Sequence, residues 1–184
     1  GFMYVKDKNI IIEKGYFTFD SFYKDYEKAT LENRHSPFVI HFRIATSGNV
    51  DFNNCHPFRI DEHAAFVHNG IFSEMSDFTN DLSDTRIFNE TILKRLPKNW
   101  EHSEGIISLL ESFVQNAGSK LIILCNTGHA YIIGEEAGNW HRGCWYSNSD
   151  IVIVFSDKKS CWYIVRNHFI YLNSWRYKIY IAGG

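Results

Sequence analysis

The order of the predicted elements constrains the fold more than any other feature of this sequence. Strand-like runs stand at both ends of the chain, and most of the segments with helical spacing lie between them. A parallel sheet would need strands and helices to alternate, which they do not. We therefore predict an α+β fold with its helices grouped, and 184 residues suit one domain of ordinary size.

The N-terminal part predicts a hairpin followed by a helix. Two β-branched and aromatic runs flank Asp7-Lys8-Asn9, which is the pattern of a β-hairpin. Thr18 stands where an N-cap residue is favoured. Aromatic residues then recur at helical spacing: Phe19, Phe22, Tyr23 and Tyr26. The runs SPFVIHFRIAT and AAFVHNGIF predict the next strands.

Helices and further strands are predicted beyond residue 80. The segment SDTRIFNETILKRLP reads as a helix capped by Ser83, with Pro97 just past its end, and SEGIISLLESFVQNAG reads as a second helix stopped by Gly118. Strand-like runs follow: KLIILC, AYIIG and CWYSN. The runs after Asp150 predict extra strands at a sheet edge, so we treat residues 151–184 as a β-rich C-terminal extension of the same domain.

Composition excludes several classes of protein. A net charge of −2 gives no electrostatic argument for nucleic-acid binding. No apolar run approaches the roughly 18–20 residues that a membrane span needs. The four cysteines form no CxxC pair and no phosphate loop is present, so we expect no metal and no cofactor. Nothing indicates secretion, and we expect reduced thiols in a cytoplasmic protein.

Arg43 lies in an otherwise apolar strand, HFRIATSG, beside Thr46, Ser47 and Gly48. Strand alternation places His41 and Arg43 on one face and Phe42 on the other. An arginine that faces a cleft can hold a carboxylate through two parallel hydrogen bonds. The alternative is a structural ion pair between Arg43 and an acidic residue of the next strand.

His68-Asn69-Gly70 stands at the end of a predicted strand. An Asn side-chain amide and a Gly backbone N–H can point at one spot, as an oxyanion hole requires. Asn-Gly is also the commonest signal for a type I′ turn. Taken alone, the dipeptide favours the turn.

Asp84 and the pair Cys55-His56 each have a structural and a functional interpretation. A carboxylate in the first turn of a helix is favourable because of the helix dipole, but it could equally hold a substrate ammonium group. Adjacent Cys and His residues in a strand point to opposite faces, so they are poor evidence for a nucleophile pair. His56, before Pro57, is a candidate residue of a pocket wall.

Taken together and in order, four motifs resemble the glutaminase domain of class II glutamine amidotransferases. The motifs are HFRIATSG, NNCHPF, FVHNGIF and SDTRIFNETIL. The resemblance is closest to the small stand-alone and phage-type members, and it covers roughly residues 1–150. It implies the N-terminal-nucleophile hydrolase fold, a four-layer α-β-β-α sandwich, without its first strand and helix.

The resemblance also implies roles for individual residues. Arg43 would grip the α-carboxylate of glutamine, with Thr46 and Ser47 lining that end, and Asp84 would hold the α-ammonium group. Asn69 and Gly70 would form the oxyanion hole, and His56 would line the pocket. The position of Ser47 is often His in the family, which weakens the match at that contact.

The resemblance leaves the nucleophile unassigned. In the family it is an N-terminal cysteine whose α-amino group can act as the base, whereas this sequence begins with Gly1. By analogy, about thirty residues carrying that cysteine are expected before Gly1 or on another chain, and the 184 residues alone should not hydrolyse glutamine.

Three functions follow as hypotheses. The first is a glutaminase that releases glutamate and ammonia through a cysteinyl thioester. The second is a catalytically inactive binding or regulatory protein that acts through a partner, for which the aromatic residues after Asp150 are suitable types. The third keeps the fold but cleaves a different amide.

Overall fold

The computed structural model describes residues 1–43, 49–75, 81–141 and 143–148, together with the backbone of the strands within 151–182. Thr46 and Ser47 lie outside the described residues, as do the side chains of the aromatic residues after Asp150. Helices and mainly antiparallel sheets make up the described part, so the α+β prediction is confirmed. None of these helices combines the length and apolar character that crossing a membrane requires.

The larger sheet has the strand order β2-β1-β3-β12-β9-β8. Its strands are β1 (Phe2–Lys6), β2 (Asn9–Glu13), β3 (Phe38–His41), β8 (Asn139–His141), β9 (Cys144–Tyr146) and β12 (Phe169–Leu172). The predicted hairpin is confirmed, since β1 pairs with β2 across a turn in which Asp7 and Lys8 have φ angles of 51° and 60°. Positive φ at both central residues is the signature of a type I′ turn, whose twist matches that of the strands.

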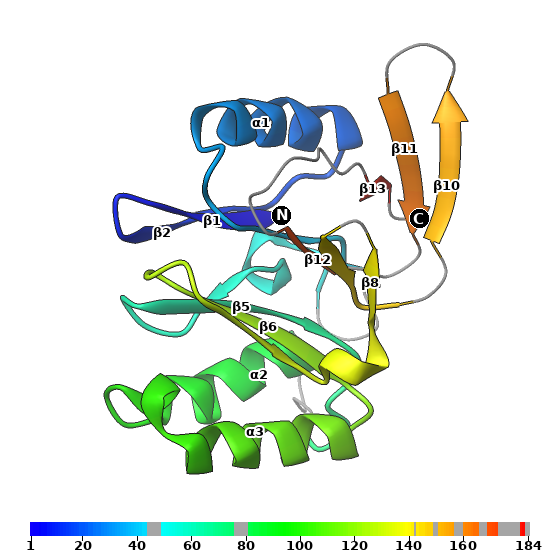
Figure 1. The fold of residues 1–184 in the computed structure, drawn as a ribbon. Helices are drawn as coiled ribbons and strands as arrows, with labels where there is room; N and C mark the ends of the chain where they lie inside the picture. Colours follow the sequence, from blue (N-terminus) through cyan, green and yellow to red (C-terminus); the bar gives the residue numbers. More distant parts are fainter. Residues whose placement is uncertain are drawn as a thin grey trace.

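The strand β12 corrects one prediction. We expected the segments after Asp150 to add strands at a sheet edge, but β12 pairs antiparallel with both β3 and β9 and is therefore internal. The remaining strands, β10 (Ile151–Ser156), β11 (Ser160–Val165) and β13 (Ile181–Ala182), form a separate sheet (Figure 1). Local sequence predicted the strands but not their partners, because pairing between distant segments leaves no local pattern.

A four-stranded sheet, called the smaller sheet below, packs with the larger sheet to form the core. It has the order β4-β5-β6-β7 and is antiparallel throughout. Its strands are β4 (Phe58–Arg59), β5 (Ala64–Asn69), β6 (Lys120–Cys125) and β7 (Ala130–Ile133). The connection from β5 to β6 contains the helices α2 and α3. The end of β5 is therefore placed opposite the start of β6, with Asn69 facing Lys120 in the register.

The helices begin at the predicted caps. They are α1 (Phe19–Glu32), α2 (Asp84–Thr91) and α3 (Glu104–Asn116), with short 3-10 turns at Phe52–Asn54, Leu93–Arg95, Trp100–His102 and Glu135–Ala137. The Thr18 and Ser83 side chains accept hydrogen bonds from the backbones of Ser21 and Arg86, and Gly118 follows α3 with a φ of 62°. The helix predicted for SDTRIFNETILKRLP is shorter than expected, because α2 gives way to a 3-10 turn after Ile92.

The two sheets pack face to face, and the helices cover their outer faces (Figure 1). Phe2, Phe22 and Tyr26 join α1 to the larger sheet. Met3, Val39, Val67, Ile122 and Trp145 are among the buried residues between the sheets. The third cluster, which includes Phe66, Phe88, Val114 and Leu121, joins α2 and α3 to the smaller sheet.

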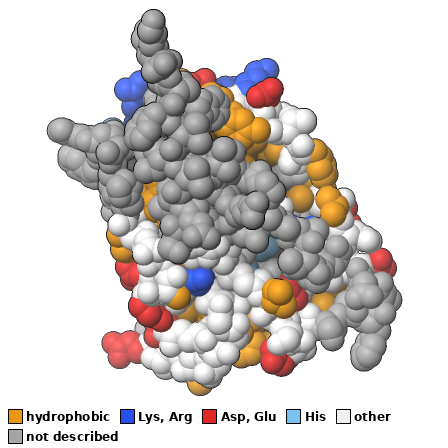
Figure 2. All heavy atoms as spheres, turned by 90° about the vertical axis from the view of Figure 1, so that its right-hand side faces the viewer, with side chains coloured by type: hydrophobic (Ala, Val, Ile, Leu, Met, Phe, Trp, Pro, Cys, Tyr) orange, Lys and Arg blue, Asp and Glu red, His pale blue; other side chains and the backbone are white. Residues whose placement is uncertain are grey.

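Part of the hydrophobic surface of the described residues is visible in Figure 2. Hydrophobic side chains gather at the upper right of that face, whereas in the lower half they are interspersed with charged side chains. Phe17 and Leu31, at the two ends of α1, are 69% and 47% exposed. The α1 layer is therefore less completely covered than the core between the sheets.

Candidate functional site

The end of β3, the end of β5 and the start of α2 are joined by hydrogen bonds at one end of the two-sheet core. His41 Nε2 lies 3.0 Å from the carbonyl oxygen of His68, and His68 Nδ1 lies 2.7 Å from the hydroxyl of Thr85. These residues are close in sequence to Arg43, Asn69 and Asp84. The structure thus brings together the segments that carry the predicted site residues, although they are far apart in the sequence.

Asp84 is the first residue of α2 and only 8% exposed. Its Oδ2 accepts a 2.8 Å hydrogen bond from the backbone N–H of Phe72. The position at the helix N-terminus stabilises the carboxylate, as the structural interpretation requires. The bond to Phe72 also fixes the loop after Gly70. The Asp84 carboxylate is therefore held near the bend at Asn69 and Gly70, which is called the Asn69-Gly70 corner below.

The type I′ turn predicted locally for Asn69-Gly70 is wrong. Asn69 is the last residue of β5, and it is not among the described residues with positive φ, which a type I′ turn needs at both central positions. In addition, β5 pairs with β6 rather than with a strand directly after the dipeptide. Gly70 has a φ of 133° and is exposed, so the corner reaches solvent.

Ser119 explains why residue 70 must be glycine. A Cβ on Gly70 would collide with the Ser119 hydroxyl and come within 2.8 Å of the Ser119 Cα. Ser119 is held there by α3, because its N–H donates to the Val114 carbonyl at 2.9 Å. The Ser119 side chain is 2% exposed, and its hydroxyl has no hydrogen-bond partner among the described residues.

Asn54 connects the Arg43 side of the site to the start of α2. Its amide nitrogen donates to the carbonyls of Asn49 at 3.2 Å and Asp81 at 2.8 Å, and its Oδ1 accepts from the Ser83 N–H at 2.9 Å. Asn54 is 0% exposed, so each of these bonds satisfies a group that water does not reach. Asn54 thus links the segment at Asn49 to the start of α2.

Arg43 follows β3 and is partly buried. Its Nη1 donates to the Asn49 carbonyl at 3.2 Å. The predicted strand runs only to His41, but the alternation holds, since Phe42 packs against the α1 cluster and His41 is buried on the other side. The contact with Asn49 attaches the guanidinium to the Asn54 network.

The histidines His41, His56 and His68 form a buried cluster beneath the site. The rings of His41 and His56 stack with centroids 3.9 Å apart, and His56 Nδ1 accepts from the His68 N–H at 3.2 Å. Burial holds the pKa of His41 and His56 well below 6.5, and it lowers that of His68 to about 4 although Asp84 opposes the shift. His56 is 4% exposed, so its ring packs under the site rather than at an open pocket wall.

The described cysteines are free thiols, as predicted: Cys55, Cys125 and Cys144. Burial raises the pKa of Cys125 and Cys144 to about 12, which makes both poor nucleophiles. Cys55 is partly exposed, and its carbonyl accepts from the Lys14 ammonium at 3.1 Å. Within the described ranges, no group of three or more His, Cys, Asp or Glu side chains could hold a metal ion.

No family model, curated protein or solved structure matches this chain. The function has therefore to be inferred from the site itself. Sequence reasoning missed Asn54 and Ser119. Asn54 lies within the motif NNCHPF, but the prediction for this motif rested on the neighbouring Cys and His. Ser119 has no local signal, since its importance comes from its contact with Gly70.

Proposed function

We propose that this chain is the glutaminase part of a class II glutamine amidotransferase, with the N-terminal-nucleophile hydrolase sandwich. It would hydrolyse the side-chain amide of glutamine to glutamate and ammonia. The observation that carries the proposal is the Asn54 network, together with the contacts of His68 with His41 and Thr85. These contacts unite four sequence motifs that are each ambiguous alone. The arrangement of two facing sheets between helices is compatible with the proposed sandwich.

The proposed clamp for the amino-acid end of the substrate consists of Arg43 and Asp84. A zwitterion needs one fixed cation and one fixed anion, and holding both orients the side-chain amide for attack. The Asp84 carboxylate is fixed by its bond to Phe72, and the Arg43 guanidinium by its bond to Asn49. Thr46 and Ser47 would complete the carboxylate end.

Asn69 and Gly70 are the proposed oxyanion hole. In the proposed reaction a cysteine thiolate attacks the amide carbon and forms a C–S bond, and the carbonyl oxygen becomes an oxyanion. The amide nitrogen takes up a proton and leaves as ammonia, and water then cleaves the thioester to glutamate. The exposed Gly70 N–H and the partly exposed Asn69 side chain lie where such an intermediate could be reached.

The proposal requires a nucleophilic cysteine from outside the printed 184 residues. Cys125 and Cys144 are buried with raised pKa values, and an internal cysteine has no free α-amino group to act as a base. The ammonia acceptor would belong to a partner or a separate protein.

The test is a glutaminase assay on the full-length gene product. We expect glutamate release from L-glutamine, and a loss of about 100-fold or more in kcat/KM for Arg43→Ala. The matched control is Arg95→Ala, which removes an exposed arginine whose side chain contacts the Glu90 carbonyl. No glutamate release by the wild-type protein would contradict the proposal.

The alternative is a binding protein that keeps the amino-acid clamp without turnover. It is supported by the fixed positions of Arg43 and Asp84, which are all that binding of the amino-acid end requires. Calorimetry with L-glutamine separates the two, since binding that Arg43→Ala abolishes, without glutamate release, would favour the binding protein.

A further inference from the structure

Lys120 is a partly buried cation that faces the candidate oxyanion corner. It is the first residue of β6 and lies directly opposite Asn69 in the antiparallel register. Side chains at directly opposed positions share one face of a sheet, with Cβ atoms about 5 Å apart. The charge of Lys120 is thus built into the sheet next to the proposed oxyanion donor.

Strand alternation shows which face this is. Ala65 and Val67 of β5 and Ile122 and Leu124 of β6 all pack between the two sheets. Asn69 continues the first series and Lys120 continues the second, so both lie on the inner face.

The ammonium group of Lys120 has no carboxylate partner among the described residues. Its Nζ lies 3.5 Å from Oδ1 of Asn148, a neutral amide. The described ion pairs involve only Glu62, Glu90 and Glu101 as acids. Burial alone lowers the pKa of Lys120, which agrees with a cation that lacks a fixed counter-charge.

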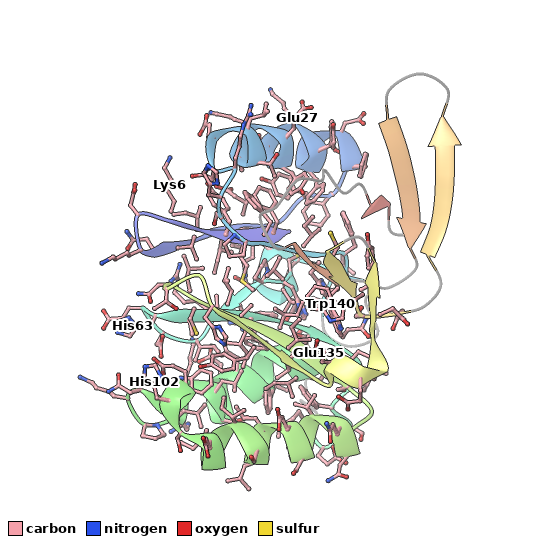
Figure 3. All side chains as sticks on the ribbon, in the orientation of Figure 1. Lys6, Glu27, His63, His102, Glu135 and Trp140 are labelled. Atoms are coloured by element: carbon pink, nitrogen blue, oxygen red, sulfur yellow. The ribbon has the colours of Figure 1, made fainter. Side chains whose placement is uncertain are left out.

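Glu135 could have neutralised this cation but is engaged elsewhere. It follows Gly134, where an added Cβ would lie 3.5 Å from Cγ of Lys120. Its carboxylate accepts a 2.7 Å hydrogen bond from the indole N–H of Trp140, and the two residues lie at the same end of the molecule in Figure 3. Among the described residues, the contact given for the Lys120 ammonium group is therefore the one with the neutral Asn148 amide.

We propose that Lys120 is the cationic member of the anion-binding corner formed by Asn69 and Gly70, where it stabilises the negative charge of a bound carboxylate or developing oxyanion. This inference extends the proposed amide hydrolysis and rests on it for the oxyanion. Anion binding at the corner needs only the residues described here. A cation close to preorganised N–H donors strengthens their hold on negative charge in a low-dielectric site.

The first test is kinetic and uses the full-length protein with L-glutamine. We expect Lys120→Met to lower kcat about 10- to 100-fold with KM changed less than about threefold, and Lys120→Arg to recover most of the loss. The Arg variant should also extend activity to higher pH, because the guanidinium stays charged. The control Lys98→Met removes an exposed lysine and should leave both constants unchanged.

The second test does not depend on turnover. Acetate, as a simple carboxylate, is titrated into the ¹⁵N-labelled protein while the Gly70 amide is followed by NMR. Saturable shifts of Gly70 in the wild type and in Lys98→Met, weakened at least about 10-fold in Lys120→Met, are expected. An inactive wild type that shows this response would contradict the proposed hydrolysis but support the role of Lys120.

The inference is overturned by either of two results. One is a Lys120→Met protein that keeps the kcat of an active wild type. The other is a Gly70 amide that does not respond to acetate, or that responds equally in Lys120→Met.

Discussion

The two ends of the β5–β6 ladder differ in how they treat polar side chains. At the Ala64–Cys125 end, Asp61 accepts from the backbones of His63 and Ala64, and the Glu62–His63 pair is exposed. At the opposite end, polar side chains are buried: Asn54, His68, Asp84 and Ser119 are 0%, 3%, 8% and 2% exposed. His63 marks the solvated end in Figure 3.

This difference shows at which end of the ladder the fold has an unfavourable free energy of burying polar groups. Burying polar groups is unfavourable unless their hydrogen bonds are restored. Burying hydrophobic side chains at this end would cost less free energy. Proteins keep such buried polar groups most often where chemistry or binding needs them. We therefore place the proposed site at the Asn69–Lys120 end of the ladder and use the Ala64–Cys125 end as the comparison.

The largest expected effect comes from Asn54→Ala. The change leaves the buried Ser83 N–H without its bond and removes the bond from Asn54 to the Asp81 carbonyl. We expect a loss of about 3 kcal/mol in the free energy of unfolding, measured by urea titration. The matched control is Asn126→Ala, which removes the 3.2 Å contact with His63 at the exposed end and should cost about 0.5 kcal/mol. Equal losses of unfolding free energy for both variants would contradict the difference between the two ends of the ladder.

A smaller loss is expected for Gly70→Ala. The new methyl group would overlap Ser119, and a residue with a Cβ is strained at a φ of 133°. We expect a cost of about 2 kcal/mol in thermal or urea unfolding. Gly105→Ala is the opposite case, because an added Cβ there meets nothing within 4 Å and alanine favours α3. That variant should gain about 0.5 kcal/mol, and a loss there as large as at Gly70 would refute the steric explanation.

The smallest effect is a change in the pH dependence of stability. A buried histidine with a lowered pKa stays neutral when folded but gains a proton when unfolded below pH 6.5. Its contribution is fully present above pH 6.5 and is lost as the pH falls, by about 1.4 kcal/mol per unit. Because the unfolded histidine is only half protonated at pH 6.5, His56→Gln should reduce the fall in unfolding free energy between pH 6.5 and 5.5 by about 1 kcal/mol. Gly105→Ala changes no titratable side chain and should leave the slope unchanged.

The charged groups around this cluster do not change the sign of that prediction. Arg43 and the Gly1 amino group both disfavour protonation of His41 and His56, and Asp84 favours protonation of His68. In a chain that begins at Gly1, burial also lowers the pKa of the amino group to about 5, which adds to the total slope. The difference between the variant and the wild type cancels this addition.

Local sequence signals predicted the helices and strands of the fold. Contacts between segments that are distant in the sequence could not be predicted. The Thr18 and Ser83 caps and the Gly118 stop act within one turn of a helix, so the sequence around them was sufficient. The place of β12 inside the larger sheet depends on pairing with β3 and β9, which no local pattern encodes.

The candidate site divides in the same way. Arg43, Asn69 and Asp84 were found because ordered motifs carry them. Lys120 was not found, because its interest comes from the register that places it opposite Asn69. The local turn signal of Asn69-Gly70 was misleading, since a contact with Ser119 and not a hairpin sets the conformation there.

The central claim is that the Asn69–Lys120 end of the ladder binds an amino-acid amide. The most direct measurement is an NMR titration of the ¹⁵N-labelled protein with L-glutamine. We predict saturable shifts at the amides of Gly70 and Phe72, whose N–H donates to Asp84, and no shift at His63 or Ala64. Shifts confined to His63 and Ala64, or no saturable shift at all, would contradict the claim.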